Sequence, residues 1–404
     1  MIDLEKYHIG VLGNGISAKG VIRELDERCI RYEHFKETTD IKIDEIDLLI
    51  KSPGIYYDDI LKNIMCNTNI LVMGDIELFY LLYPDKYYIA VTGTCGKTTV
   101  CSIIYNLLKD ILNINYVGNN EITIFDGKYY DYVLVELSSF QLLLVNEFKP
   151  NIAIITNIEK AHLDYHSDFT EYENAKRNIY QNFTDELLIH PSKVEVPDFL
   201  RHVMYDKDTD IYFDKTDIYF NNKKFISLKD IKLSGSHNYN NILMALQVIK
   251  ELKIDEHLIL DSLKNFKGVE HRLELVYNDS LLVYNDSKST STYSTITALN
   301  AFDKPVYLIL GGYDRNNDIN ELDPFLNKIK FVYLFGAIRE KLANYFLKKN
   351  ISFVITDLTD AVNHFFNNAK SGDILLFSPG NPSYDEYKSF VERGEAFKKI
   401  INKL

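Results

Sequence analysis

The stretch Gly93-Thr-Cys-Gly96-Lys97-Thr98-Thr99 separates an apolar run, residues 87–91, from an amphipathic run, residues 97–109. The first run is predicted to be a buried β-strand and the second an α-helix, so the glycine-rich stretch is the turn between them. Backbone N–H groups at a helix start bind phosphate oxygens, and Lys97 can reach the outer phosphates of a nucleotide. The Thr98 hydroxyl can bind Mg²⁺. The stretch therefore predicts a site for a nucleoside triphosphate.

The stretch is a shortened variant of the usual phosphate loop. The strict motif needs a glycine five residues before Gly96, but Val91 occupies that position and the glycine stands at Gly93 instead. The alternative is a loop that needs glycine only for its shape. Nucleotide binding is the better interpretation, because a strand and a helix flank the loop.

Strands and helices alternate along the rest of the chain. This alternation is typical of parallel sheets covered by helices, and it predicts three α/β domains. The predicted strands are 8–12, 31–35, 47–50, 70–72, 87–91, 131–136, 151–156, 281–284, 305–310, 331–335, 352–355 and 373–377, with helices at 17–25, 97–109, 238–252 and 255–265. Residues 210–225 are predicted to form an antiparallel hairpin with a turn at 221–224.

Composition excludes several classes of protein. The 404 residues are 46% hydrophobic and 25% charged, which is typical of a globular protein with buried cores. The net charge of −13 argues against general binding to nucleic acid or to a membrane surface. The four cysteines form no regular pattern, and neither a signal peptide nor a membrane-spanning run is apparent. We therefore expect a cytoplasmic protein.

A second glycine-rich turn follows the first predicted strand. Gly13-x-Gly15-x-x-Ala18 fits the dinucleotide-binding pattern, and Glu33 lies near the expected acidic position. Three interpretations stay open: an NAD site, a site for a different phosphate, and a tight turn that holds no ligand.

Polar residues also follow two strands of the central block. Glu136 ends a strand beside the phosphate loop, where a carboxylate can bind Mg²⁺ or simply contact solvent. His162 and His166 are spaced like two zinc ligands, but no third ligand is evident, so a role for His162 with Mg²⁺ or substrate competes with a surface role. Lys176, within a helical run, is by default a solvated lysine.

Three polar segments follow strands of the last block, at 285–290, 311–315 and 378–383. The carboxyl ends of parallel strands meet at one edge of a sheet, where ligands bind. Lys288 and Arg315 could each bind a carboxylate or a phosphate there.

These motifs together resemble the Mur ligase family, over nearly the whole chain. The resemblance rests on an ordered series of segments: Ser52-Pro-Gly54, Gly74-Asp-Ile-Glu77, Gly93–Thr99, Glu136-Leu-Ser-Ser-Phe-Gln-Leu142, Ile155-Thr-Asn-Ile158, His162-Leu-Asp164, Gly235-Ser-His-Asn238 with Asn241, His271-Arg-Leu-Glu274, Asn285-Asp-Ser-Lys288, and Ser383-Tyr-Asp385 with Phe390 and Arg393-Gly394.

The resemblance implies a three-domain α/β fold. Residues 1–85 would form a Rossmann-like domain that binds a UDP-substrate, and residues 86–268 a central P-loop-type ATPase domain with a mainly parallel sheet. Residues 269–404 would form a doubly wound Rossmann-like domain that binds an amino acid. The implied activity is ATP-dependent amide ligation in cytoplasmic peptidoglycan precursor synthesis. The segment Glu136–Leu142 favours the member that adds D-glutamate to UDP-N-acetylmuramoyl-L-alanine through an acyl phosphate.

The family also implies a role for individual residues. Lys97, His162 and Lys176 would be catalytic, and Thr98, Glu136, His162 and Lys176, the last as a carbamate, would bind two Mg²⁺ ions. ATP would contact Gly93, Thr94, Cys95, Gly96, Lys97, Thr98, Thr99, Asn241, Arg272 and Asp286. The UDP-substrate would contact Ser17, Ser52 and Asn119, and D-glutamate would contact Lys288, Thr290, Arg315, Ser383 and Phe390. The enzyme would act as a monomer on small molecules.

The chain departs from the family pattern in five places. Cys95 stands where asparagine is usual, Ala161 where aspartate is usual, Tyr165 where arginine is usual and Arg315 where lysine is typical, and Asn119-Asn-Glu121 lacks the expected glycine. None removes an obligatory phosphate or metal ligand, so we expect an active enzyme. The alternatives are a sibling ligase, a folylpolyglutamate synthase, an NAD-dependent oxidoreductase and a nucleotide-binding protein without catalysis.

Overall fold

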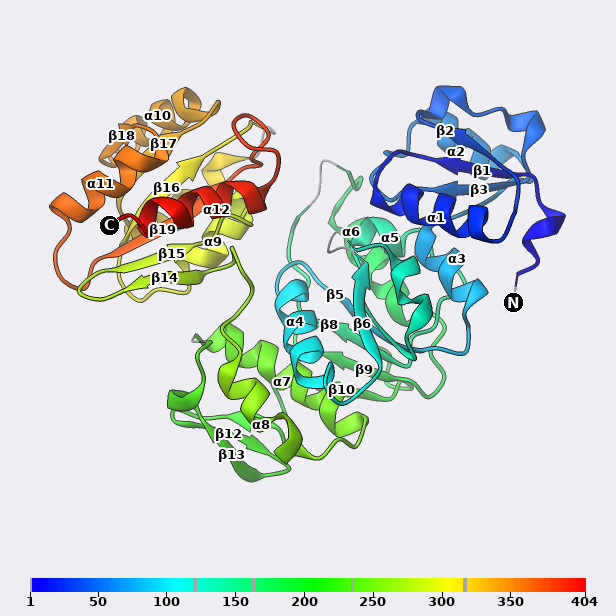
Figure 1. Cartoon of the computed structure of the whole chain (residues 1–404), viewed down its shortest axis with the longest axis horizontal. Helices are drawn as coiled ribbons and strands as arrows, with labels where there is room; N and C mark the ends of the chain where they lie inside the picture. Colours follow the sequence, from blue (N-terminus) through cyan, green and yellow to red (C-terminus); the bar gives the residue numbers. More distant parts are fainter. Residues whose placement is uncertain (1, 119–121, 162–164, 234, 315–317) are drawn as a thin grey trace. The chain divides into compact units, whose positions relative to one another are not determined.

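The computed structural model describes residues 2–118, 122–161, 165–233, 235–314 and 318–404 (Figure 1). The chain forms two compact units, one of residues 1–234 and 238–266 and the other of residues 235–237 and 267–404. The fold is α/β with mainly parallel sheets, as predicted. We describe each unit by itself.

The N-terminal unit begins with a four-stranded parallel sheet in the order β2-β1-β3-β4. Its strands are β1 (Ile9–Leu12), β2 (Tyr32–Phe35), β3 (Leu48–Lys51) and β4 (Leu71–Met73), and its helices are α1 (Ile16–Glu27), α2 (Asp59–Asn67) and α3 (Asp75–Leu82). Buried residues of α1 and α3 pack on one face of the sheet, and those of α2 pack on the other. This arrangement confirms the predicted Rossmann-like fold.

The same unit contains a six-stranded parallel sheet in the order β10-β9-β8-β5-β7-β6. Its elements are β5 (Tyr87–Thr92), α4 (Lys97–Leu108), β6 (Ile114–Gly118), β7 (Tyr132–Glu136), α5 (Ser139–Leu142), β8 (Ile152–Ile155), α6 (Phe169–Arg177), β9 (Leu187–His190), β10 (His202–Met204), α7 (Ser236–Glu251) and α8 (Glu256–Asn265). Helices α4, α7 and α8 pack on one face of this sheet. In this strand order, β5, which leads into the glycine-rich loop, lies in the interior of the sheet between β8 and β7.

The predicted hairpin is confirmed and has a third strand. Strands β12 (Asp217–Phe220) and β13 (Lys223–Ser227) pair antiparallel, and β11 (Tyr212–Phe213) adds to β12. Asn221 and Asn222 form the turn with φ angles of +50° and +59°. Asparagine tolerates this left-handed conformation, which two-residue hairpin turns require.

The C-terminal unit holds a six-stranded sheet in the order β14-β15-β19-β16-β17-β18. Its elements are β14 (Glu274–Asn278), β15 (Leu282–Asn285), α9 (Thr292–Leu299), β16 (Val306–Gly311), β17 (Ile329–Phe335), α10 (Arg339–Lys348), β18 (Phe353–Ile355), α11 (Leu358–Asn368), β19 (Ile374–Gly380) and α12 (Phe390–Ile401). Helices α9 and α10 cover one face, and α11 and α12 cover the other. The sheet is doubly wound, as predicted, but the antiparallel edge strand β14 was not predicted.

Short 3₁₀ helices complete the description of both units. They are Leu4–Lys6, Thr38–Asp40, Ile43–Glu45, Ile124–Tyr129, Asn178–Tyr180, Leu228–Asp230 and Ile319–Lys328.

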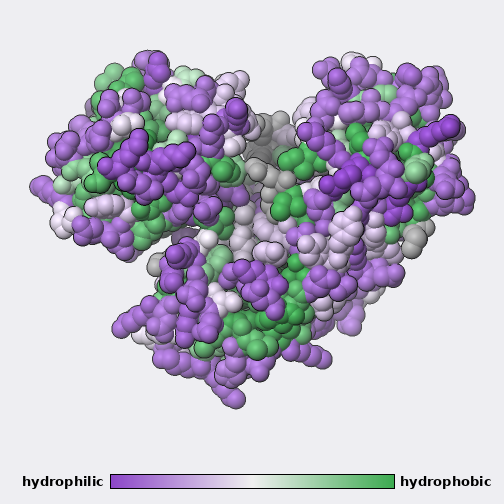
Figure 2. All heavy atoms as spheres, in the orientation of Figure 1, coloured by the Kyte–Doolittle hydropathy of each residue, from purple (hydrophilic) through white to green (hydrophobic). Residues whose placement is uncertain are grey.

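Hydrophilic side chains dominate the face of the molecule seen in Figure 2, with smaller hydrophobic areas among them. Within the described ranges, no helix combines the length and the hydropathy that crossing a bilayer requires.

The two sheets of the N-terminal unit share one hydrophobic core. Buried side chains of α3, such as Phe79, belong to the same cluster as Val11 of β1 and Val135 of β7. Glu77 of α3 strengthens this junction, because its carboxylate accepts hydrogen bonds from the N–H groups of residues 146, 147 and 148 at 2.7–3.1 Å. Helix α3 is thus held by the N-terminal sheet and by the loop before β8.

We expect the substitution Glu77→Ala to destabilise the N-terminal unit. Glu77 is 2% exposed, and its loss would leave three backbone donors without their partner, which costs about 3 kcal/mol. Urea unfolding followed by circular dichroism measures the change. The matched control is the exposed residue Glu147, whose change to Ala should cost less than about 0.5 kcal/mol. Equal effects of the two variants would contradict the role of Glu77.

A buried histidine pair makes stability depend on pH. His190 of β9 is 2% exposed, and its Nε2 lies 2.9 Å from Nδ1 of His202 on β10. Burial lowers the pKa of His190 below its usual value, so folding favours the neutral ring. The resulting stability is present above about pH 6.5, the unfolded pKa, and is lost as the pH falls through the folded pKa.

We therefore expect the free energy of unfolding to decrease between pH 7 and pH 5 by about 1 kcal/mol more in the wild type than in His190→Asn. Urea unfolding at the two pH values measures this difference. Identical pH dependence of the two proteins would exclude His190 as its source.

Candidate active site

The glycine-rich loop joins β5 to α4 as predicted. Gly93 has φ +147° and Gly96 has φ +85°, a left-handed conformation that favours glycine. A side chain at Gly93 would also collide with Thr156, since its Cβ would lie 1.9 Å from the Thr156 Oγ1. The loop therefore requires glycine at these two positions, and it leads directly into the first turn of a 12-residue helix. This is a suitable arrangement for binding phosphate.

Two residues after β8 hold this loop in place. The Thr156 hydroxyl and the Asn157 side-chain amide donate to the carbonyl oxygen of Cys95 at 2.5 and 3.0 Å. The Cys95 N–H donates in return to Asn157 Oδ1 at 3.0 Å. Neither residue had a predicted role, although their position at the end of a strand next to β5 is typical of residues that contact a phosphate loop. Because they bind the backbone of Cys95, the unusual cysteine is compatible with the loop shape.

Two lysines meet at the loop. Lys97 Nζ donates to the carbonyl oxygens of Gly93 at 2.9 Å and Thr94 at 3.2 Å. Lys176 Nζ donates to the same Gly93 oxygen at 2.8 Å and is only 2% exposed. Burial, together with the charge of Lys97, lowers the pKa of Lys176 well below its ordinary value. The default prediction from the residues alone, a solvated lysine, is therefore wrong for Lys176.

A hydroxyl and a carboxylate lie together at the start of α4. Thr98 Oγ1 donates to Glu136 Oε1 at 3.1 Å, and the Tyr116 hydroxyl donates to Glu136 Oε2 at 2.5 Å. Glu136 is 2% exposed. Hydroxyl and carboxylate oxygens are ligands that Mg²⁺ prefers, so Thr98 and Glu136 fit the expected metal. The predicted third ligand, His162, lies outside the described residues.

The remaining predicted ATP-binding residues of this unit lie in the glycine-rich stretch or next to it. Thr94 Oγ1 lies 2.9 Å from the Tyr172 hydroxyl, and Thr99 is buried in the first turn of α4. Asn241 of α7 approaches the loop closely, since its Oδ1 lies 3.0 Å from the position of a Cβ on Gly96. The structure thus brings the loop, Glu136, Lys176 and Asn241 together.

A separate cleft of about 550 Å³ lies beside the turn after β1. It contains both predicted UDP-substrate residues that the structure describes, Ser17 and Ser52. Gly118 also lines it, and the predicted residue Asn119, which follows Gly118, lies outside the described residues. The hydroxyl of Ser52 faces Gly13, where a Cβ would lie 2.4 Å from Oγ. The dinucleotide-like turn is therefore part of a ligand-sized cleft.

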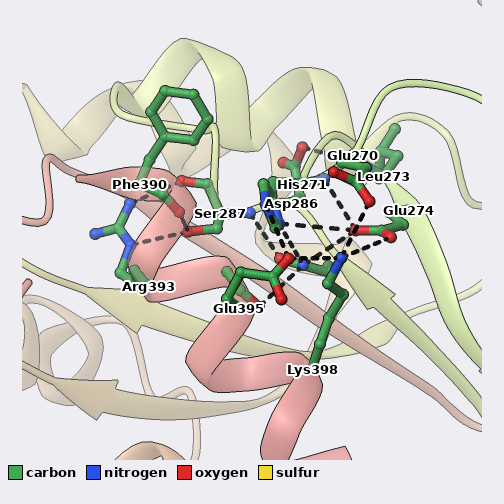
Figure 3. A network of polar contacts seen from close by, with 12 residues as sticks. Glu270, His271, Leu273, Glu274, Asp286, Ser287, Phe390, Arg393, Glu395 and Lys398 are labelled. Carbon is green, nitrogen blue, oxygen red and sulfur yellow. Dashed lines mark hydrogen bonds and ion pairs between the residues drawn. The ribbon is translucent and has the colours of Figure 1, made fainter.

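Asp286 lies in a dense polar network of the C-terminal unit (Figure 3), and Arg272 belongs to the same unit. Asp286 accepts hydrogen bonds from the Leu273 N–H at 3.1 Å and the Ser378 hydroxyl at 2.7 Å. Burial raises the pKa of this carboxyl to about 6. Arg272 Nε is buried and has no hydrogen-bond partner among the described residues.

Acidic side chains gather next to this network without forming a convincing metal site. Ligand atoms of Glu270, His271 and Glu395 lie within 4.8 Å of one another. Lys398 contacts both glutamates, with Nζ 2.7 Å from the carboxylate of Glu395 and 3.4 Å from that of Glu270 (Figure 3). The ammonium group of Lys398 therefore already neutralises part of the negative charge of the two glutamates, which a metal cation would otherwise neutralise.

Four of the predicted amino-acid-binding residues are described by the structure. Lys288 and Thr290 follow β15, and Ser383 follows the adjacent strand β19. Lys288 Nζ lies 5.5 Å from the ring centroid of Phe390, at the start of α12. Arg315 lies outside the described residues.

Arg393 holds this part of the unit together, although no site role was predicted for it. Its guanidinium is fully buried and donates to the carbonyl oxygens of Ser287 at 2.8 Å and Asn381 at 3.0 Å. Burial lowers the pKa of Arg393 to about 10. Arg393 thereby connects the loops after β15 and β19. Its place in the Arg393-Gly394 motif is the feature of the sequence that could have indicated this role.

Two family models match the chain. The Mur ligase middle domain matches residues 91–249, and the Mur ligase, glutamate ligase domain matches residues 271–381.

Curated relatives match over most of their length. The UDP-N-acetylmuramoylalanine--D-glutamate ligase of Staphylococcus epidermidis is 38% identical over 375 residues, which cover 88% of this chain and 82% of the relative. The ligase of the same name from Macrococcus caseolyticus is 36% identical over 403 residues, which cover 95% of this chain and 90% of the relative.

Solved structures of related ligases share the fold. The UDP-N-acetylmuramate-alanine ligase MurC of Thermotoga maritima superposes with a TM-score of 0.62 at 19% identity, covering 98% of this chain and 99% of that one. The MurF ligase of Thermotoga maritima, in complex with ADP, gives 0.59 at 17% identity and covers both chains fully. The family models and the 36–38% identical relatives agree with the predicted resemblance: the chain belongs to the Mur ligase family.

Proposed function

We propose that the protein is an ATP-dependent ligase that joins D-glutamate to UDP-N-acetylmuramoyl-L-alanine, releasing ADP and phosphate. The relatives that match over 88–95% of the chain carry the name of this ligase. The observation that carries the chemistry is the meeting of Lys97, Thr98 and Glu136 at the start of α4. This geometry suits phosphoryl transfer, which depends on positioning and on charge stabilisation.

The reaction needs an activated carboxylate, because a free carboxylate is a poor acyl donor. Transfer of the γ-phosphoryl group to the alanyl carboxylate gives an acyl phosphate, and attack by the amine of D-glutamate then releases phosphate. Lys97 and the N–H groups of the loop would stabilise the charge on the transferring group. Bound at Thr98 and Glu136, with His162 and a carbamylated Lys176 at a second site, Mg²⁺ would neutralise further charge.

We assign the other predicted residues to three binding regions. Asn241, Arg272 and Asp286 would contact ATP, and Ser17, Ser52 and Asn119 would contact the UDP-substrate. Lys288, Thr290, Arg315, Ser383 and Phe390 would form the amino-acid pocket. We propose domain boundaries after residues 85 and 268, a monomeric state and a cytoplasmic location, with no nucleic-acid or membrane partner.

Phosphate release tests this function. The assay contains ATP, Mg²⁺ and UDP-N-acetylmuramoyl-L-alanine, and it compares D-glutamate with L-glutamate, L-lysine and meso-diaminopimelate. We expect release only with D-glutamate, together with a product heavier by one glutamyl unit. Release with another amino acid would change the specificity but keep the ligase. ATP binding without release in any mixture would favour a non-catalytic role.

A further inference from the structure

Lys51, the last residue of β3, is a buried lysine that the proposed reaction does not use. It is 0% exposed, and Lys176 is the one other lysine of the described ranges that is fully buried. Lys176 lies at the phosphate loop, whereas Lys51 lies beside the 550 Å³ cleft of the N-terminal unit. Its surroundings therefore need a separate explanation.

Within the described ranges, the contacts of the Lys51 ammonium group are all with neutral groups. Nζ donates to the carbonyl oxygen of Ser52 at 3.2 Å and lies 3.5 Å from the Tyr165 hydroxyl. The centroid of the Tyr57 ring is 4.4 Å away. Within the described part of the chain, no carboxylate forms an ion pair with Lys51. The carbonyl oxygen and the aromatic face compensate part of the charge but do not neutralise it.

Burial lowers the pKa of Lys51 to about 8, so most of the molecules carry the charge at pH 7. A buried cation without a counter-ion destabilises a protein, because the interior solvates it less well than water. An anion that binds nearby removes part of this penalty. The local electrostatics therefore favour an anionic ligand over a neutral one of the same shape.

The cleft places such a ligand close to Lys51. Ser52, whose carbonyl oxygen accepts from Lys51, lines the cleft together with residues 53–55. Ser52 is itself 9% exposed, and its hydroxyl has no hydrogen-bond partner among the described residues. This hydroxyl faces the turn at Gly13, which leads into α1. The cleft is thus lined by the Ser52 hydroxyl, which has no partner among the described residues, and by the start of the 12-residue helix α1.

We propose that Lys51 is a specificity-determining residue that makes this cleft select an anionic sugar nucleotide. The inference rests on the proposed function, whose substrate carries a diphosphate and a carboxylate. Lys51 does not itself line the cleft, but its ammonium group donates to the carbonyl oxygen of Ser52, which does. The positive charge therefore attracts an anion bound in the cleft. At an effective dielectric constant of about 20, one charge pair without direct contact changes affinity by about tenfold or more.

The variant Lys51→Met tests the proposal, because methionine keeps an unbranched side chain and removes the charge. Isothermal titration calorimetry without ATP would measure the dissociation constants of UDP-N-acetylmuramoyl-L-alanine, UDP and uridine. We expect the first two constants to rise about tenfold and that of uridine to change less than twofold. We also expect an unchanged or higher melting temperature, since an apolar side chain replaces a buried charge.

The matched control is Lys86→Met. Lys86 is partly buried and also donates to a backbone carbonyl oxygen, that of Tyr130, at 2.6 Å, but it precedes β5 and does not line the cleft. This variant should bind all three ligands as the wild type does. Lys51→Gln provides a second uncharged side chain if the methionine variant does not fold.

The outcomes separate the interpretations. A loss confined to the full substrate would assign the attraction to the alanyl carboxylate, and a loss shared by UDP would assign it to the diphosphate. Equal weakening of UDP and uridine would show a purely structural Lys51 and overturn the proposal. Unchanged constants for all three ligands would also overturn it, while leaving the proposed function intact. Wild-type protein that binds no sugar nucleotide would overturn both.

Discussion

Replacing Lys97 with Ala should lower kcat/KM for phosphate release by at least about 10³-fold. Lys97 Nζ bridges the carbonyl oxygens of Gly93 and Thr94, so the ammonium group is fixed over the loop that would hold the phosphates. Without it, the charge on the transferring phosphoryl group loses its nearest protein cation. The measurement is steady-state phosphate release with saturating UDP-N-acetylmuramoyl-L-alanine and D-glutamate.

Lys109→Ala is the control for this variant. Lys109 caps the opposite end of α4 and is exposed, so its removal tests a lysine on the same helix without a contact to the loop. Its activity should stay within about twofold of the wild type, because surface substitutions change little. Activity of Lys97→Ala within a few-fold of the wild type would remove Lys97 from the mechanism.

The second large effect is expected for Lys176→Ala. Burial lowers the pKa of the Lys176 amine, which raises its neutral fraction, and the neutral amine reacts with CO₂ to form a carbamate and release one proton. The carbamate would offer oxygen atoms to Mg²⁺, whereas an ammonium group would repel it. We expect the rate of phosphate release to fall by about 100-fold or more, because the variant enzyme lacks one of the proposed metal ligands.

Chemical rescue distinguishes a carbamate from an ordinary lysine. Acetate or formate should restore part of the activity of Lys176→Ala, because a small carboxylate can occupy the space of the missing carbamate. The same acids should not restore Lys97→Ala, which lacks a cation. Wild-type activity in Lys176→Ala, or the same response of both variants to acetate, would contradict the carbamate.

The features that sequence alone predicted are those that depend on neighbours in the chain. The glycine-rich loop was predictable because a strand, two glycines and a helix follow one another within residues 87–109. Glu136 was predictable because the carboxyl ends of parallel strands meet at one edge. The hairpin at residues 217–227 was predictable from its asparagine turn.

The features that sequence reasoning missed depend on contacts between distant segments. Lys176 reaches the carbonyl oxygen of Gly93 across 83 positions, so its burial could not be inferred from the helical pattern around it. Thr156 and Asn157 bind the loop from 61 and 62 positions away. Lys51 ended an apolar run and gave no sign that its charge would be buried. The placements of Asn119, His162 and Arg315 stay predictions.

The core shared by the two N-terminal sheets has a consequence for biosynthesis. The apolar side of α3 packs against residues of β7, and the Glu77 carboxylate accepts hydrogen bonds from the N–H groups of residues 146–148. While the ribosome has released only the first 85 residues, these partners have not yet been made. The emerging segment therefore carries an uncovered apolar surface until about 60 more residues appear, and such surfaces attract chaperones or other nascent chains. A truncated gene product ending before β7 would retain that surface for its whole lifetime.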